Sequence, residues 1–95
     1  MGDRRELRDL ASIGPAMLKD FDRLGIHTVR ELSRRSPEKL YEQLCAARGQ
    51  RQDICVLDVF RCAVAQARAR VRGRRLPAAQ RNWWYWSRLR KKNKM

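Results

Sequence analysis

The clearest pattern along the chain is a run of apolar positions at helical spacing in its second half. These positions recur every three or four residues and define one face of a single helix. Asp53, directly before the run, can accept a hydrogen bond from the first free N–H groups of such a helix. The pattern therefore predicts a central core helix over residues 53–72. Its apolar face consists of Val56, Val59, Phe60, Ala63, Val64, Ala67 and Val71.

Start and stop signals divide the first half of the chain into shorter helices. Asp3 and Glu6 form a capping-box pair that predicts the start of a first helix, with Leu10 on its apolar edge. Pro15 suits the first position of a second helix, because the N–H that proline lacks has no acceptor there. Gly25 suits the position just after the end of that helix.

Two further caps predict two more helices. Thr28 and Glu31 have the spacing of another capping box, which opens a short helix. Ser36 is a cap, and Pro37 follows it at the first helical position. We expect the helix that begins there to end at Gly49, because glycine readily adopts the left-handed conformation of a helix end.

The chain ends in an aromatic-rich segment that we expect to form a last helix over residues 78–90, followed by a frayed basic tail over residues 91–95. No stretch alternates apolar and polar residues as a strand does. We therefore predict an all-α fold. It is a single compact domain over residues 1–95, with about five helices.

The charge of the chain is concentrated in its last third. The formal net charge is +13. Residues 1–60 carry 11 basic and 10 acidic side chains, whereas residues 61–95 carry 12 basic and no acidic ones. This asymmetry indicates a polyanionic partner, with nucleic acid as the first candidate and an acidic membrane surface as the second.

Length and composition exclude several classes of protein. A chain of 95 residues is too short for a two-domain enzyme. No apolar run approaches the roughly 20 residues that a membrane helix needs, and the first residues lack the apolar stretch of a signal peptide. Three cysteines in such a chain favour a reducing compartment, so we expect a cytoplasmic location and buried thiols.

The turn before the second predicted helix is a candidate phosphate site. The first N–H groups of a helix have no acceptor within it and carry partial positive charge, so a phosphate oxygen fits there. Gly14 has no Cβ, which allows a sugar-phosphate backbone to come close. The candidate N–H donors are those of Gly14, Ala16 and Met17. Further candidate contacts are Lys19, Arg23 and Ser12, although Ser12 could instead cap the helix.

Residues 7–32 resemble the helix-hairpin-helix motif, so we expect a hairpin unit over residues 3–32. The matching positions are Leu10, Ile13, Gly14, Pro15, Leu18, Leu24, Gly25 and Ile26. The sequence departs from the usual pattern at Ser12, where a first glycine is common, and at Ala16, where a basic or polar residue is common. The resemblance implies DNA binding through the turn, although some members use the hairpin only for packing.

Residues 7–90 are also similar to the small "pathogenicity locus" family, whose members are called mitomycin-resistance proteins or helix-hairpin-helix proteins. The similar segments include Leu-Gly-Ile-His-Thr-Val-Arg-Glu-Leu over residues 24–32, Ser36 to Tyr41, Asp53 to Arg61, and Asn82 to Ser87. The family's activity is poorly defined. Its mitomycin label implies contact with damaged or cross-linked DNA.

A series of arginines lies on another face of the central helix and directly after it, and forms a second candidate phosphate surface. We expect these arginines to have no acidic partners, so that they repel one another unless an anion neutralises them. The alternative is that these arginines only form the solvent-exposed polar face that a long helix needs. A basic amphipathic helix on a membrane is a third reading, but the core requires the apolar face. The series consists of Arg61, Arg68, Arg72, Arg74 and Arg75.

Four consecutive aromatics, Trp83 to Trp86, cannot all face inward on one helix. Two or three of the rings can close an otherwise aliphatic core. We expect one ring, Trp84, to stay exposed among Arg81, Arg88 and Arg90. There it could stack on an unpaired base or contact a partner protein.

No catalytic or metal-binding set stands out. His27, the only histidine, lies in a connection between helices, and Cys45, Cys55 and Cys62 lack the spacing of a zinc site. We therefore expect no enzymatic activity, no cofactor, no metal and no small-molecule substrate. The predicted function is sequence-independent DNA binding through phosphates, by the turn and by a basic surface that includes Arg88. The alternative is a protein-interaction module that uses the aromatic cluster.

Overall fold

The computed structural model describes residues 7, 10–11 and 13–92, and every regular element among them is helical. This part of the chain contains no strand, which confirms the all-α prediction. The helix start expected at Asp3 and Glu6 lies outside the described residues. The elements are α2 (Pro15–Arg23), α3 (Val29–Ser33), α4 (Pro37–Arg48), α5 (Ile54–Val71), the 3₁₀ helix η1 (Ala78–Arg81) and α6 (Trp83–Lys92).

Helices α2 to α5 begin at the residues that their local chemistry predicts, and α4 also ends at one. Pro15 is the first residue of α2. The side chains of Thr28, Ser36 and Asp53 each accept a hydrogen bond from a backbone N–H in the first turn of the following helix. Gly49 ends α4 in the left-handed conformation, with φ of 70°. These caps need only residues close in sequence, which is why the sequence predicts them.

Replacing Thr28 with alanine is expected to destabilise the protein by about 1 kcal/mol, since the N–H of Glu31 then loses its acceptor. Thr28 Oγ1 lies 3.1 Å from that nitrogen, and the Glu31 carboxylate accepts in return from the N–H of Thr28. Urea unfolding followed by circular dichroism measures the change. Thr28→Ser keeps the hydroxyl and serves as the control; an equal loss in both variants would contradict the capping role.

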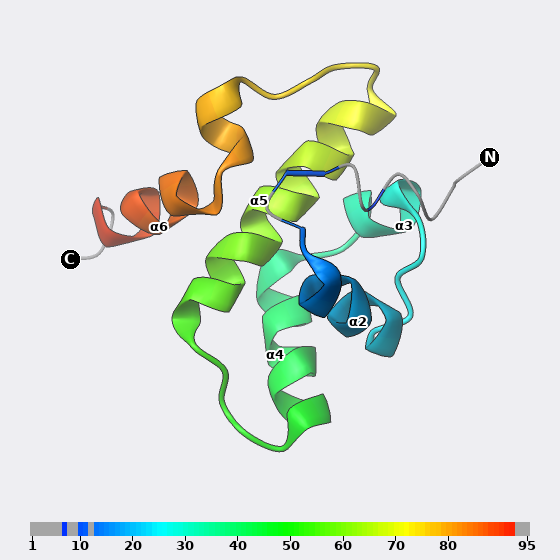
Figure 1. Cartoon of the computed structure of the whole chain (residues 1–95), viewed down its shortest axis with the longest axis vertical. Helices are drawn as coiled ribbons and strands as arrows, with labels where there is room; N and C mark the ends of the chain where they lie inside the picture. The colour runs from blue at the N-terminus through cyan, green and yellow to red at the C-terminus, as the bar shows by residue number, and fades with distance from the viewer. Residues whose placement is uncertain (1–6, 8–9, 12, 93–95) are drawn as a thin grey trace.

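Helix α5 runs diagonally through the centre of the molecule and contacts most of the other elements. In Figure 1, α2, α3 and α4 lie on one side of α5, and α6 lies on the other. The radius of gyration is 12.7 Å. A folded chain of this length has about 12.4 Å. The chain is therefore one compact domain.

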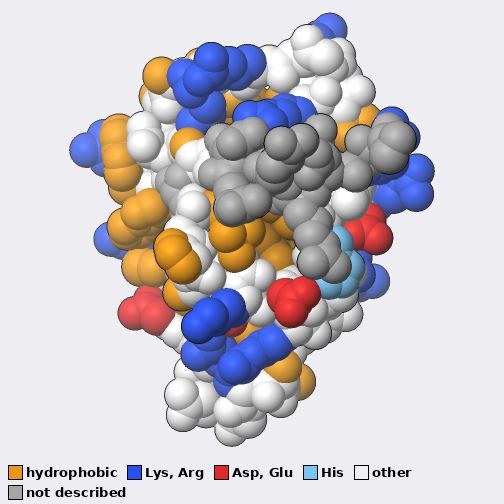
Figure 2. All heavy atoms as spheres, turned by 45° about the vertical axis from the view of Figure 1, so that its right-hand side comes forward, with side chains coloured by type: hydrophobic (Ala, Val, Ile, Leu, Met, Phe, Trp, Pro, Cys, Tyr) orange, Lys and Arg blue, Asp and Glu red, His pale blue; other side chains and the backbone are white. Residues whose placement is uncertain are grey.

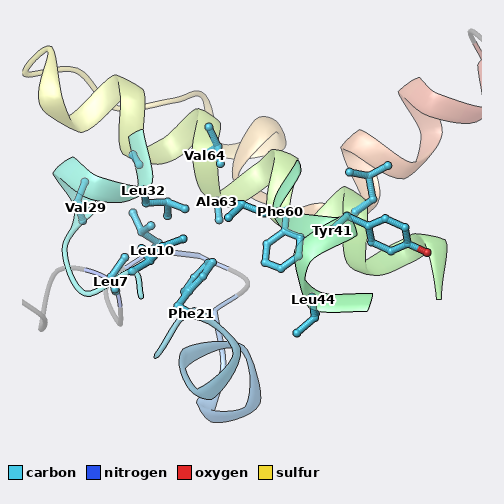
Figure 3. Close-up of a cluster of buried hydrophobic side chains, with 14 residues drawn as sticks. Leu7, Leu10, Phe21, Val29, Leu32, Tyr41, Leu44, Phe60, Ala63 and Val64 are labelled. Atoms are coloured by element: carbon cyan, nitrogen blue, oxygen red, sulfur yellow. The ribbon is translucent and has the colours of Figure 1, made fainter. Parts of the chain in front are cut away.

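The core lies between α5 and the N-terminal helices (Figure 3). The rings of Phe21 and Phe60 face one another across it, with centroids 5.8 Å apart. Leu7 and Leu10 are buried beside them, so the segment before α2 is anchored in the core. The turn at Gly14 is therefore held between two anchored segments.

Two details of the predicted helices are wrong. Val71 is 45% exposed rather than part of the core, because burial along α5 ends at Ala67. The last helix is not continuous from residue 78: Asn82 is extended, with ψ of 131°, and separates η1 from α6. The carbonyl of Asn82 accepts from the N–H of Tyr85, and α6 then continues through Lys92, which lies in the expected tail.

Candidate nucleic-acid interface

The turn before α2 is open to solvent. Gly14 is exposed and extended, with φ of −102° and ψ of −179°. Among the described residues, no neighbouring atom lies within 4 Å of the position that a Cβ would take there. A ligand can therefore approach the backbone of Gly14 closely.

The first N–H groups of α2 have no carbonyl acceptor within the helix. The carbonyl of Gly14 accepts from the N–H of Leu18, at 3.1 Å. The N–H groups of Ala16 and Met17 precede that bond, and within the described part of the chain neither has an acceptor. The first turn of α2 also contains no acidic side chain. Among the described residues, no side chain compensates the partial positive charge of this helix start.

The two basic side chains predicted to assist this turn lie at different distances from it. Lys19 and Arg23 are both exposed. At 1.5 Å per residue, Lys19 is about 7 Å along the helix axis from Gly14, and Arg23 is about 13 Å away at the opposite end. Only Lys19 is close enough to share a phosphate group with the turn. Ser12, the remaining candidate, lies outside the described residues.

A buried glutamine fixes the turn to the central helix. Gln66 of α5 accepts from the N–H of Ala11 through Oε1 and donates to the carbonyl of Ala11 through Nε2, both at 2.9 Å. Its side chain is almost fully buried. This two-bond clamp joins segments that are 55 residues apart. The clamp places Ala11, three residues before Gly14, beside the C-terminal half of α5, which carries Arg68 and Arg70.

Three arginines surround a small cavity next to the clamp, which we call the arginine pocket. Its volume is about 50 Å³. Its arginines come from three different segments, namely α5, the loop after it, and η1. The lining residues are Ala11, Gln66, Arg70, Arg75, Leu76 and Arg81.

The sequence-based series of arginines is only partly accessible to a ligand. Arg61 donates from Nε and Nη2 to Glu38, at 3.2 and 3.1 Å. The expectation that the series has no acidic partners is therefore wrong at Arg61. The N–H of Glu38 itself, and then Arg61, hold the pKa of the Glu38 carboxyl below its usual value.

Arg68 also has structural partners. Its guanidinium donates to the carbonyls of Ser33 and Arg35, at 3.1 and 3.2 Å, and so joins α5 to the end of α3. Arg72, Arg74 and Arg75 are exposed, and within the described residues their side chains have no hydrogen-bonded partner. Figure 2 shows Lys and Arg side chains spread in several groups over one face rather than in one patch.

The aromatic segment divides between the core and the surface. Trp84 is 43% exposed, as predicted, but Trp83 is exposed as well, at 38%. The rings of Tyr85 and Trp86 are partly buried and meet edge to face. The guanidinium of Arg88 stacks 4.9 Å from the centre of the Trp84 ring. Trp84, Arg88 and Lys91 are four and three residues apart and form one exposed face of α6.

Arg90 does not accompany the exposed ring as expected. It forms three hydrogen bonds of 3.1 to 3.2 Å with the carboxylate of Asp58, which is fully buried in α5. The hydrogen bonds that Arg90 donates to Asp58 are the main cause that raises the pKa of Arg90. This ion pair anchors α6 to the central helix and orients its other face outward.

The remaining candidate chemistry is sparse within the described residues. His27 lies 3.3 Å from Asp22, and the described part contains no group of three side chains able to hold a metal. None of the three cysteines forms a disulfide, and only Cys62 is buried; Cys45 and Cys55 are half-buried. The hydrogen bond with Asp53 raises the pKa of the Cys55 thiol. No helix in the described part is long and apolar enough to span a membrane.

Sequence analysis missed three of the residues that form the arginine pocket. It named Arg75 but not Gln66, Arg70 or Arg81 as binding residues. Arg70 lies off the helical stripe that joins Arg61, Arg68 and Arg72, and the return of the chain after Gly73 brings Arg75 and Arg81 beside it. Because the pocket joins segments that are far apart in the sequence, no local pattern identifies these residues.

These features define a small, strongly basic all-α domain. The chain belongs to the pathogenicity locus (Cdd1) family, whose model matches residues 2–92. It is 39% identical over 90 residues to the mitomycin resistance protein McrB of Streptomyces lavendulae, an alignment that covers 95% of this chain and 78% of that protein. No solved structure matches it.

Proposed function

We propose that the protein is a non-catalytic DNA-binding module that contacts phosphates without reading base sequence, and that this binding contributes to mitomycin resistance. The observation that supports it is the Gln66 clamp, which fixes Ala11, three residues before Gly14, at the edge of the arginine pocket. Backbone N–H donors and guanidinium groups are both typical phosphate ligands.

The turn and the arginines supply complementary parts of such an interface. The N–H groups of Ala16 and Met17 offer short, fixed donors at the positive end of a helix. Arg72, Arg74 and Arg75 offer charge on longer side chains that can follow a phosphate backbone. The helix-hairpin-helix resemblance of residues 7–32 agrees with this assignment.

The resistance role rests on the similarity to the Streptomyces protein and on its name. A module that binds DNA without base contacts can engage DNA at lesions anywhere in a sequence.

The proposal is tested by fluorescence anisotropy of a labelled duplex at several salt concentrations. Neutralising about four phosphates predicts a slope of log K against log salt of about −3.6. Gly14→Glu places a carboxylate where a phosphate would bind and is expected to weaken binding about tenfold or more.

Ala47→Glu is the matched control, because it changes the net charge equally on the exposed surface of α4. Circular dichroism verifies that both variants are folded. A steep slope with equal binding by the two variants would remove the turn from the interface. Absence of binding near physiological salt would overturn the DNA assignment.

A protein-interaction module is the second candidate, favoured by the exposure of Trp83, Trp84 and Leu89 on one helix. Aromatic side chains of this size often anchor protein interfaces. Binding of a partner through this surface would depend weakly on salt and would be lost in Trp84→Ala.

A further inference from the structure

The arginine pocket is a concave feature with a high density of positive charge. Arg70, Arg75 and Arg81 line it from three segments, and none of its described lining residues is acidic. Gln66, its buried polar member, already uses its amide on Ala11. The ligand chemistry is therefore set by the guanidinium groups, which favour an oxyanion that several of them can contact.

The size of the pocket suits one phosphate group. A water molecule needs about 10–15 Å³ measured in this way. A cavity of about 50 Å³ therefore has room for more than one water molecule but not for a large ligand. A phosphate group is a compact ligand of five heavy atoms, whereas a nucleoside is far larger.

The shape of the pocket distinguishes between two kinds of phosphate. An internal phosphate of DNA is a diester, with a sugar on each side, so it cannot enter a small cavity without the attached sugars. A terminal phosphate is a monoester with three free oxygens and a charge of about −1.5 to −2 at neutral pH. Several arginines around one small cavity match the charge of a phosphate monoester better than the single negative charge of a diester.

We propose that the arginine pocket binds a phosphate monoester, namely the terminal phosphate of a DNA strand. The inference rests on the proposed DNA binding and adds a preference for DNA ends. Ala11 at the pocket is three residues from Gly14, hence at most about 11 Å away. A strand whose terminal phosphate occupies the pocket can therefore reach the N–H groups at the start of α2 with a following phosphate.

The test compares DNA ends of one sequence in the full chain. Three duplexes are titrated by competition anisotropy: one with terminal phosphates, one with terminal hydroxyls, and one closed at both ends by hairpin loops. The wild-type protein is expected to bind the phosphorylated duplex about tenfold more tightly than the other two.

Two double variants identify the pocket as the cause. Arg70→Gln with Arg75→Gln removes two lining charges, and we expect it to abolish the preference for phosphorylated ends. Arg72→Gln with Arg74→Gln removes two exposed charges from the same segment outside the pocket, and we expect it to weaken all three duplexes equally while retaining the preference. Circular dichroism and the melting temperature verify that both variants fold.

A direct titration with inorganic phosphate and with adenosine monophosphate, followed by NMR, separates this inference from the proposed function. Tight DNA binding by the wild-type protein without any preference for terminal phosphates would overturn the inference and leave the proposed function standing. Binding of adenosine monophosphate, lost in the pocket variant, without DNA binding would overturn both and identify a small phosphorylated molecule as the ligand.

Discussion

Replacing Arg90 with methionine is expected to be among the most destabilising single changes on the surface of α6. The substitution leaves the carboxylate of Asp58, which is fully buried, without a counter-charge. Breaking a buried pair in this way costs about 3–5 kcal/mol. The carboxylate reaches water only if α6 detaches from α5. The free energy of unfolding in urea, followed by circular dichroism, measures the loss.

The matched control is Arg88→Met on the same helix. Arg88 is exposed, and its stacking on Trp84 contributes about 0.5–1 kcal/mol. The decisive variant combines Arg90→Met with Asp58→Leu, since replacing a buried ion pair by apolar residues is often neutral. We expect the double variant to recover most of the loss. Additive losses in the two single variants would show that Asp58 and Arg90 are not energetically coupled.

The contrast between the caps and this ion pair explains what could be predicted from sequence. Thr28, Ser36 and Asp53 act within three residues, so the residue type and its spacing are sufficient. Asp58 and Arg90 lie on different helices, 32 residues apart. Sequence analysis placed Arg90 among exposed basic side chains. Its contact with Asp58 depends on the angle at which α6 crosses α5, and tertiary packing sets that angle.

The same limit applies to the arginine series. A helical stripe correctly groups Arg61 and Arg68 on one face of α5, but it does not show what lies opposite. Glu38 of α4 reaches Arg61, and the end of α3 reaches Arg68. The arginines after the helix remain accessible because residues 72–77 form a loop rather than pack against another helix. Counting charged residues thus identified the basic region, but it could not show which of its arginines are accessible to a ligand.

Gln66 is the residue whose replacement is expected to affect both the fold and the proposed interface. Gln66→Leu keeps a side chain of similar size but removes both hydrogen bonds to Ala11. Each backbone group left without a partner costs about 1–3 kcal/mol, less where water reaches it. Because Ala11 is half-buried, we expect a loss of about 2–4 kcal/mol in total, measured by urea unfolding.

The effect on DNA binding is measured at a temperature where the variant is fully folded. If the turn and the arginine pocket act together, releasing the turn from α5 should weaken binding about tenfold. Ala47→Glu, remote from both, calibrates the effect of a surface change. A folded Gln66→Leu protein that binds DNA as tightly as the wild type would show that the clamp stabilises the fold without organising the interface. The arginines of residues 70–75 would then have to bind DNA independently of the turn.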